Sequence, residues 1–203
     1  MKKLTAGAIR NISSNLDYFF NIATKKEIKQ GLDWYKNANE QAKQIASQYN
    51  LNVYKVSQVI SALSPRNKWQ QNIKDANKLC EAYVLGLHPE NIKVCTFHTN
   101  KFKAFNILAS NSEITANSLK TFNFVNNIAY LSSKHLTIDI WHLRACFFND
   151  IKINSASIGK LAYEQIKVLT IDKANKLGLQ GFELQAIIWL SAQKIFINNR
   201  KTK

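Results

Sequence analysis

The chain has 203 residues, 28 of them Lys or Arg and 13 of them Asp or Glu, which gives a formal net charge of +15. Hydrophobic residues make up 46% of the chain, which excludes a disordered polypeptide, and the scarcity of Gly (6) and Pro (2) argues against a turn-rich all-β fold. No apolar run approaches the ~18 residues of a membrane span. We expect a cytoplasmic, soluble, globular protein without a membrane partner.

Positive charge is unevenly distributed along the chain. No acidic residue occurs between Glu40 and Asp75, and Asp139 is the only one between Glu113 and Asp150. Nucleic acid is the usual partner of such a protein, because Lys and Arg displace condensed counterions from phosphates. A single acid inside a basic stretch makes Asp139 the first candidate for a chemical role.

Apolar residues recur at helical spacing along the whole chain, whereas strand-like alternation is scarce. The first stripe follows Ser13 and Ser14, which we expect to cap its helix. The stripes predict helices near residues 16–23, 34–49, 53–63, 69–83, 102–108, 119–129, 158–169 and 182–197. The pattern is typical of an all-α protein with roughly ten helices.

Sequence motifs for cofactors and metals are absent. There is no Gly-rich phosphate loop and no H-E-x-x-H pair, and the four histidines lack the spacing of metal ligands. The three cysteines are widely separated, so they predict neither a disulfide framework nor a metal site. We expect no cofactor and no metal.

Two short segments carry the most specific pattern. Lys120 lies in Ser-Leu-Lys-Thr-Phe, and Asp139 follows 19 positions later in Thr-Ile-Asp-Ile-Trp-His-Leu-Arg, with Arg144 five positions after the acid. This arrangement resembles the helix-hairpin-helix superfamily of DNA glycosylases. In that family a catalytic Lys closes the hairpin, a catalytic Asp follows at a similar distance, and a basic residue comes after the Asp.

The resemblance covers roughly residues 51–197, in the same order as in the family. Residues 56–67 are similar to an apolar helix and the loop that fills the space of an extruded base. Residues 97–108, with Lys103-Ala104, resemble the helix before the hairpin, and residues 182–196 resemble the closing helix. Ser-Pro-Arg-Asn-Lys-Trp and Trp34-Tyr35 are similar to small phage and bacterial members that act on modified pyrimidines.

The chain departs from the family pattern at three points. Thr-Ala-Asn-Ser at 115–118 replaces the Gly-x-Gly of the hairpin, and Trp141 replaces the His expected two residues after the Asp. The four-Cys iron–sulfur loop of the family is missing.

The resemblance implies a two-lobe helix-hairpin-helix glycosylase fold with its active site in the interlobe cleft. Residues 52–134 would form a six-helix lobe ending in a degenerate hairpin, and residues 1–51 plus 135–203 would form the second helical lobe. A monomer acting on double-stranded DNA is expected.

The resemblance also implies roles for individual residues. Asp139 would stabilise the positive charge that develops on the sugar as the base leaves, and the same acid also suits a helix N-cap. Lys120 would attack the sugar as a nucleophile, or would only position DNA. The expected DNA contacts are Arg66, Asn67, Lys68, Trp69, Trp141, His142 and Arg144. The expected base pocket contains Trp34, Tyr35, Phe102 and Phe105, although aromatics at helical spacing more often belong to a core.

The function predicted from the resemblance is excision of a modified or damaged base from flipped-out DNA, with or without lyase activity. Host defence against phage DNA with modified bases is one role that fits. Two alternatives stay open: a base-processing enzyme of phage DNA hypermodification, and a non-catalytic DNA-binding protein on the same fold.

Overall fold

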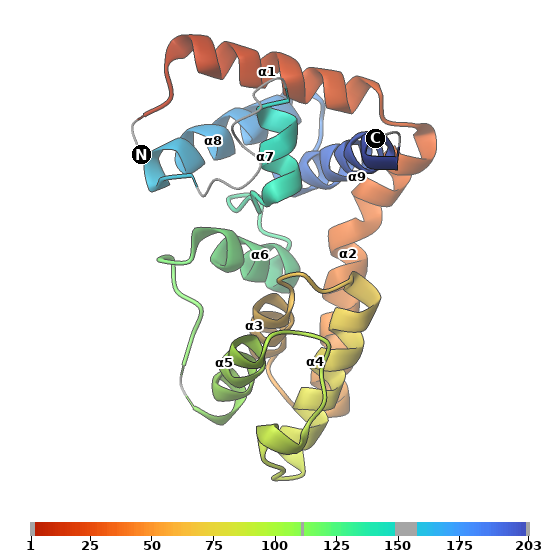
Figure 1. Cartoon of the computed structure of the whole chain (residues 1–203), viewed down its shortest axis with the longest axis vertical. Coiled ribbons are helices and arrows are strands. Elements are labelled where there is room, and N and C mark those ends of the chain that lie inside the picture. Colours follow the sequence, from red (N-terminus) through yellow and green to blue (C-terminus); the bar gives the residue numbers. More distant parts are fainter. Residues whose placement is uncertain (1–2, 111, 149–157, 202–203) are drawn as a thin grey trace. The chain divides into compact units, whose positions relative to one another are not determined.

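The regular elements of the described chain are all helices (Figure 1). The computed structural model describes residues 3–110, 112–148 and 158–201. These residues form α1 (Ala6–Asn21), α2 (Lys25–Gln48), α3 (Val53–Leu63), α4 (Trp69–Val84), the 3₁₀ helix η1 (Pro89–Asn91), α5 (His98–Ala109), α6 (Leu119–Tyr130), α7 (Ile140–Cys146), α8 (Lys160–Lys176) and α9 (Gly181–Lys201). The predicted all-α class is confirmed for these residues. None of their helices has the length and apolar character needed to cross a membrane.

The chain divides into two compact units, and the first and last parts of the chain share one of them. The terminal unit comprises Met1–Tyr35 and Ser132–Lys203, and the central unit comprises Lys36–Leu131. These boundaries differ from the sequence-based ones because the second part of α2 belongs to the central unit. There Asn39 donates from Nδ2 to the carbonyl oxygens of Ile128 (2.8 Å) and Ala129 (3.1 Å) at the end of α6.

In the terminal unit, α9 packs against α1, α7 and α8 (Figure 1). Every residue from Gly181 to Ile188 is buried, and the inward stripe of α1 contains the buried Ile12, Leu16 and Phe19. The Ser191 hydroxyl donates to the Phe19 carbonyl oxygen at 2.8 Å, which ties α9 to α1. This core supports the segment that carries Asp139.

In the central unit, α3 is the innermost helix and packs against α4, α5 and α6 (Figure 1). All eight residues from Val56 to Leu63 are buried, as expected for a helix that is covered on every side. The Gln58 side chain within it accepts from the Ile114 amide at 2.7 Å, so α3 also holds the segment before α6. The loop 64–68 leaves the end of this fixed helix.

The prediction that Ser13 and Ser14 cap the first helix is wrong. α1 begins at Ala6, and the hydroxyl of Thr5 accepts from the Ala8 amide at 3.2 Å. Ser14 lies inside the helix and donates to the Arg10 carbonyl oxygen. Ile9 and the buried Ile12 continue the stripe of Leu16 and Phe19 toward the N-terminus at helical spacing, so the helix begins before the two serines.

Candidate active site

The backbone before Asp139 is fixed by a buried tyrosine. The hydroxyl of Tyr163, on α8, donates to the Leu136 carbonyl oxygen at 2.8 Å and accepts from the Ile138 amide at 3.1 Å. Leu136, Ile138 and Tyr163 are all buried in the terminal unit. Because both sides of the segment are held, Asp139 enters α7 with a defined backbone position.

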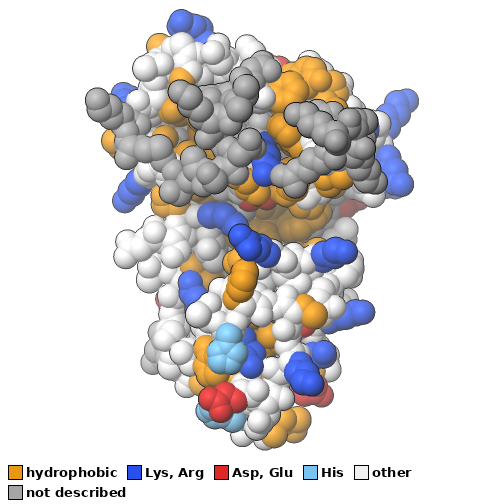
Figure 2. Space-filling model, in the orientation of Figure 1, with side chains coloured by type: hydrophobic (Ala, Val, Ile, Leu, Met, Phe, Trp, Pro, Cys, Tyr) orange, Lys and Arg blue, Asp and Glu red, His pale blue; other side chains and the backbone are white. Residues whose placement is uncertain are grey.

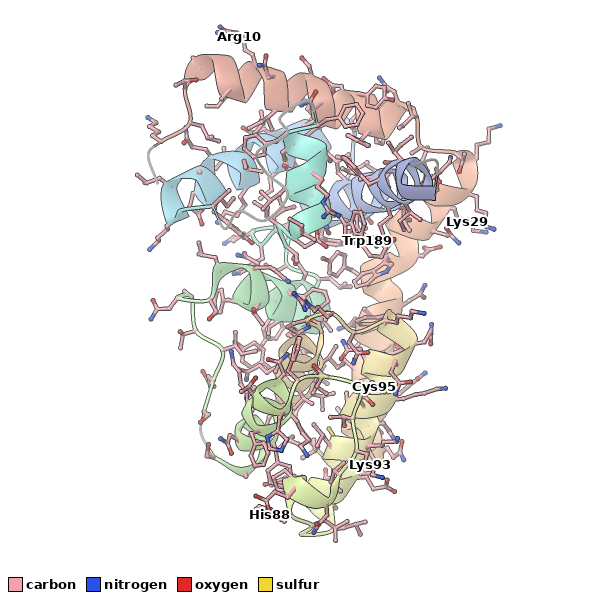
Figure 3. The ribbon with its side chains drawn as sticks, in the orientation of Figure 1. Arg10, Lys29, His88, Lys93, Cys95 and Trp189 are labelled. Atoms are coloured by element: carbon pink, nitrogen blue, oxygen red, sulfur yellow. The ribbon has the colours of Figure 1, made fainter. Side chains whose placement is uncertain are left out.

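Both carboxylate oxygens of Asp139 accept hydrogen bonds. Oδ1 accepts from the His142 amide at 2.9 Å as the N-cap of α7, and Oδ2 accepts from the indole Nε1–H of Trp189 at 2.9 Å. Trp189 lies on α9 and is labelled in Figure 3. The N-cap role considered from the sequence is confirmed. Two donors orient the half-buried carboxylate.

Trp34 and Tyr35, two of the four expected pocket residues, belong to the same unit as Asp139. The Trp34 ring lies 6.2 Å from the Trp189 ring and 4.6 Å from the Tyr35 ring, centroid to centroid. Trp34 is half-buried and lies beside the residue that holds Asp139.

Tyr35 itself is a core residue. It is 2% exposed and donates from its hydroxyl to Oε1 of Gln185 at 3.0 Å. Burial raises the pKa of Tyr35 far above its ordinary value; a hydrogen bond with Thr137 opposes this shift, and the nearby Asp139 carboxylate adds to it. Tyr35 is therefore a neutral phenol that supports the Trp34 ring from inside.

Two expected DNA contacts on α7 form a cation–π pair. The guanidinium carbon of Arg144 lies 4.6 Å from the centre of the Trp141 ring and 6.0 Å from the Phe196 ring. Trp141 and Arg144 are both half-buried. Arginine is a group that binds phosphate oxygens, and a planar guanidinium can also stack on an aromatic ring.

His142, in contrast, does not suit the predicted DNA contact. Its side chain is fully buried, and Nε2 lies 3.3 Å from the Thr170 hydroxyl. Burial lowers the pKa of His142 to about 4, so its ring is neutral at pH 7. The helix turns by about 100° per residue, which directs position 142 into the core while its neighbour at 141 reaches the surface.

The loop 64–68, which the resemblance assigns to filling the space of an extruded base, lies in the central unit. Arg66 is exposed and has a left-handed backbone with φ of 58°. Asn67 donates from Nδ2 to Oδ2 of Asp75 at 3.0 Å, which ties the loop to α4, and Lys68 is exposed. Of these three expected contacts, Arg66 and Lys68 are exposed, whereas the Asn67 amide is occupied by its hydrogen bond to Asp75.

Three expected aromatic contacts serve packing in the central unit. The Trp69 indole donates to Oε1 of Gln41 at 3.0 Å, and its ring packs edge-on against Phe124. Phe102 and Phe105 lie on α5, both half-buried. Phe102 packs on His98 at 4.6 Å and Phe105 on Tyr83 at 6.2 Å between ring centroids. These contacts lie within the central unit, whereas Asp139 belongs to the terminal one.

Lys120 is exposed in the first turn of α6 and belongs to the central unit. The segment before it makes a turn in which the Ser118 amide donates to the Thr115 carbonyl oxygen at 3.0 Å. Nucleophilic lysines are typically desolvated in an apolar pocket or lie next to another cation, whereas the Lys120 side chain is exposed. The exposure of Lys120 fits a DNA-positioning role better than a nucleophilic one.

Three residues that make this geometry were not predicted as site residues. Trp189 and Tyr163 fix Asp139, and Asp75 fixes the loop that carries Arg66. Their partners lie 50, 25 and 8 positions away in the chain. Only the pairing of Asn67 with Asp75 is local. The one sequence signal for Asp75 was that no other acid occurs between it and Glu40.

The family model described as "Family of unknown function (DUF7178)" matches residues 1–196. The match covers nearly all of the chain, so the chain belongs to this family. No curated protein and no solved structure matches the chain significantly.

Proposed function

We propose that this member of the DUF7178 family is a DNA N-glycosylase that extrudes a modified or damaged base and hydrolyses its N-glycosidic bond. The proposal includes the two-lobe helix-hairpin-helix glycosylase fold, which binds DNA in its interlobe cleft. It also includes phage DNA with modified bases as the substrate class and host defence as the role. These elements follow the sequence resemblance.

One observation carries the proposal: the Asp139 carboxylate is held by two N–H donors at the start of α7. Cleavage of the bond between base and sugar builds positive charge on the deoxyribose ring. A carboxylate whose orientation is fixed before the reaction stabilises that charge without reorganising. An acid that served only as an N-cap would need the bond to the His142 amide but not a second, tertiary donor on α9.

The surroundings of Asp139 support the recognition of a base. The half-buried Trp34 ring lies next to Trp189, and an indole face stacks on any nucleobase. Arg144, on the same helix as His142, places its guanidinium over the Trp141 ring. An acid, an aromatic face and a cation in one unit are the groups that an excision reaction requires.

The exposure of Lys120 favours hydrolysis over a lyase reaction. In the hydrolytic reaction the bond between C1′ and the base nitrogen breaks, and water adds its hydroxyl to C1′. The water's remaining proton balances the negative charge of the departing base, directly or through solvent. The products are a free base and an abasic site in an otherwise intact strand.

The proposal is tested by incubating the purified chain with a panel of phage DNAs that carry different base modifications. Released bases are identified by mass spectrometry, and abasic sites are quantified with an aldehyde-reactive probe. We expect one class of modified DNA to release its base with an equal number of abasic sites, and Asp139→Asn to release almost none.

Other outcomes select the alternatives. A base that is altered but stays attached to the DNA would identify a base-processing enzyme of hypermodification. Tight DNA binding with no change in any DNA of the panel would identify a non-catalytic binding protein and overturn the proposal.

A further inference from the structure

A buried carboxylate in the central unit joins two surface loops. Asp75, on α4, is fully buried, and its oxygens accept from three neutral donors. These are Nε2 of Gln71 at 2.9 Å, Nδ2 of Asn67 at 3.0 Å and the backbone amide of Cys95 at 2.9 Å. The loop 64–68 and the segment 92–97 are therefore held against the same point of α4, and Figure 3 shows Cys95 beside this helix.

The segment 92–97 is fixed at two further points. Lys101, buried on α5, donates from Nζ to the Ile92 carbonyl oxygen at 3.1 Å. The Phe97 carbonyl oxygen accepts from the amides of Asn100 (2.9 Å) and Lys101 (3.1 Å) in the first turn of α5. The Phe97 backbone is consequently rigid, although its side chain is 51% exposed.

Arg66 and Phe97 meet on the surface that these contacts create. The guanidinium carbon of Arg66 lies 5.6 Å from the centre of the Phe97 ring. Arg66 reaches this position with φ of 58°, a left-handed conformation that is unfavourable for a residue with a Cβ. No ion pair in the described part of the chain involves Arg66.

We infer that Arg66 and Phe97 form a platform on which an unpaired nucleobase stacks. This inference rests on the proposed function, because base extrusion leaves an orphaned base on the opposite strand. Aromatic rings and arginine planes are the groups that bind single-stranded nucleic acid by stacking. The left-handed backbone of Arg66 and the hydrogen bonds of Asp75 together hold an exposed, apolar ring with a cation beside it.

The charges around the platform suit a polyanion. Lys68 is exposed in the same loop, and Asp75, the only acid between Glu40 and Glu81, is fully buried. On the face drawn in Figure 2, Lys and Arg side chains are spread over the surface and Asp and Glu appear at few places. An acidic peptide would bind the cations but would gain nothing from the exposed face of Phe97.

The test compares two single-stranded oligonucleotides of equal length, one with bases and one made entirely of abasic residues. Affinities of the full chain and of its variants are measured by fluorescence anisotropy at several salt concentrations. Phe97→Leu retains an apolar side chain but removes the stacking ring. Leu85→Ala is the matched control, because Leu85 is 64% exposed in the same unit but lies at the C-cap of α4, ten positions after Asp75.

We expect Phe97→Leu to weaken binding of the base-containing strand by about 5- to 100-fold, the range for loss of one stacking side chain. Its salt dependence should stay the same, and binding of the abasic strand should not change. Lys68→Ala should instead weaken both strands alike and reduce the slope of log K against log salt by about 0.7. Leu85→Ala should bind both strands like the wild type.

Equal effects of Phe97→Leu on the two strands, or no effect on either, would overturn the platform. Because binding is measured without catalysis, the result is independent of base excision. If the wild type excises no base but Phe97→Leu weakens binding of the base-containing strand only, the platform stands and the glycosylase proposal fails. If the wild type excises bases but Phe97→Leu has no such effect, the glycosylase proposal stands and the platform fails.

Discussion

The indole Nε1–H of Trp189 donates a 2.9 Å hydrogen bond to Oδ2 of Asp139, across 50 positions of the chain. The bond joins α9 to the N-cap residue of α7, and both lie in the same compact unit. It leaves the Asp139 carboxylate with two fixed donors, since its other oxygen caps α7. The orientation of this acid is thus a property of the tertiary fold and not of the helix start alone.

Trp189→Phe removes the donor but keeps an aromatic ring in place. We expect kcat for base release to fall by about 10- to 100-fold, the cost of losing a hydrogen bond to a charged group, while KM changes little. Steady-state kinetics measures kcat and KM, and chemical unfolding measures the stability of the variant. A loss of stability with kcat unchanged would reduce Trp189 to a packing role.

Lys120 is expected to position DNA and not to form a covalent intermediate, because its side chain is exposed. Borohydride added during active base release should trap no protein–DNA adduct. Lys120→Ala should lower the slope of log K against log salt by about 0.9 on duplex DNA and leave kcat in place. An adduct that forms with the wild type and disappears in Lys120→Ala would instead establish a lyase.

His142 should make stability depend on pH in the acidic range. Burial holds its pKa at about 4 in the folded chain, below the ordinary 6.5. The unfolded chain therefore binds more protons between these two values, so the stability from the neutral ring is complete above pH 6.5 and is lost as the pH falls toward 4.

Urea unfolding of the wild type and of His142→Phe at pH 7, 6 and 5 measures this contribution. The wild type should lose up to about 1.4 kcal/mol per pH unit more than the variant in the lower part of this range. His88→Gln, which changes an exposed histidine, should follow the wild type. A free energy of unfolding that changes with pH in parallel for the wild type and His142→Phe would contradict this role of His142.

Gly31 allows α2 to approach α9 closely. A Cβ at Gly31 would lie 2.8 Å from the backbone nitrogen of Ile187 and 2.9 Å from its Cα, and neither backbone atom can move freely. Gly31→Ala should destabilise the fold by about 1–3 kcal/mol. Gly7→Ala is the matched control in α1, because its Cβ would meet no atom closer than 3.9 Å and Ala favours a helix. A stabilised Gly31→Ala in thermal unfolding would refute the close approach.

Helical periodicity predicted the existence of most helices because their buried stripes are long. The stripe from Val53 to Leu63 coincides with α3, and the one that begins at Trp69 coincides with the start of α4. Helix ends were harder to predict. α1 begins at Ala6, well before the predicted start near residue 16, and α7 ends at Cys146 after only 7 residues, although its apolar sequence continues to Phe148.

For the site, the sequence singled out Asp139 by its isolation among basic residues and predicted that it could cap a helix. It did not reveal the pairing with Trp189, because that contact depends on how α9 packs against α7. The burial of His142 and Tyr35 was equally hidden, since each lies beside an aromatic residue that reaches the surface. Sequence patterns identify candidate residues, whereas tertiary packing decides which side chains remain accessible.

The most direct test of the central claim compares the wild type with Asp139→Asn in single-turnover release of the base from modified duplex DNA. The substitution keeps the size of the side chain and an oxygen that can cap α7, but it removes the negative charge. Base release should fall by roughly 10²- to 10³-fold, the loss expected for one preorganised electrostatic group. DNA affinity should be unchanged or tighter, because a negative charge near phosphates is lost. Release at the wild-type rate by a folded, DNA-binding Asp139→Asn variant would contradict the account.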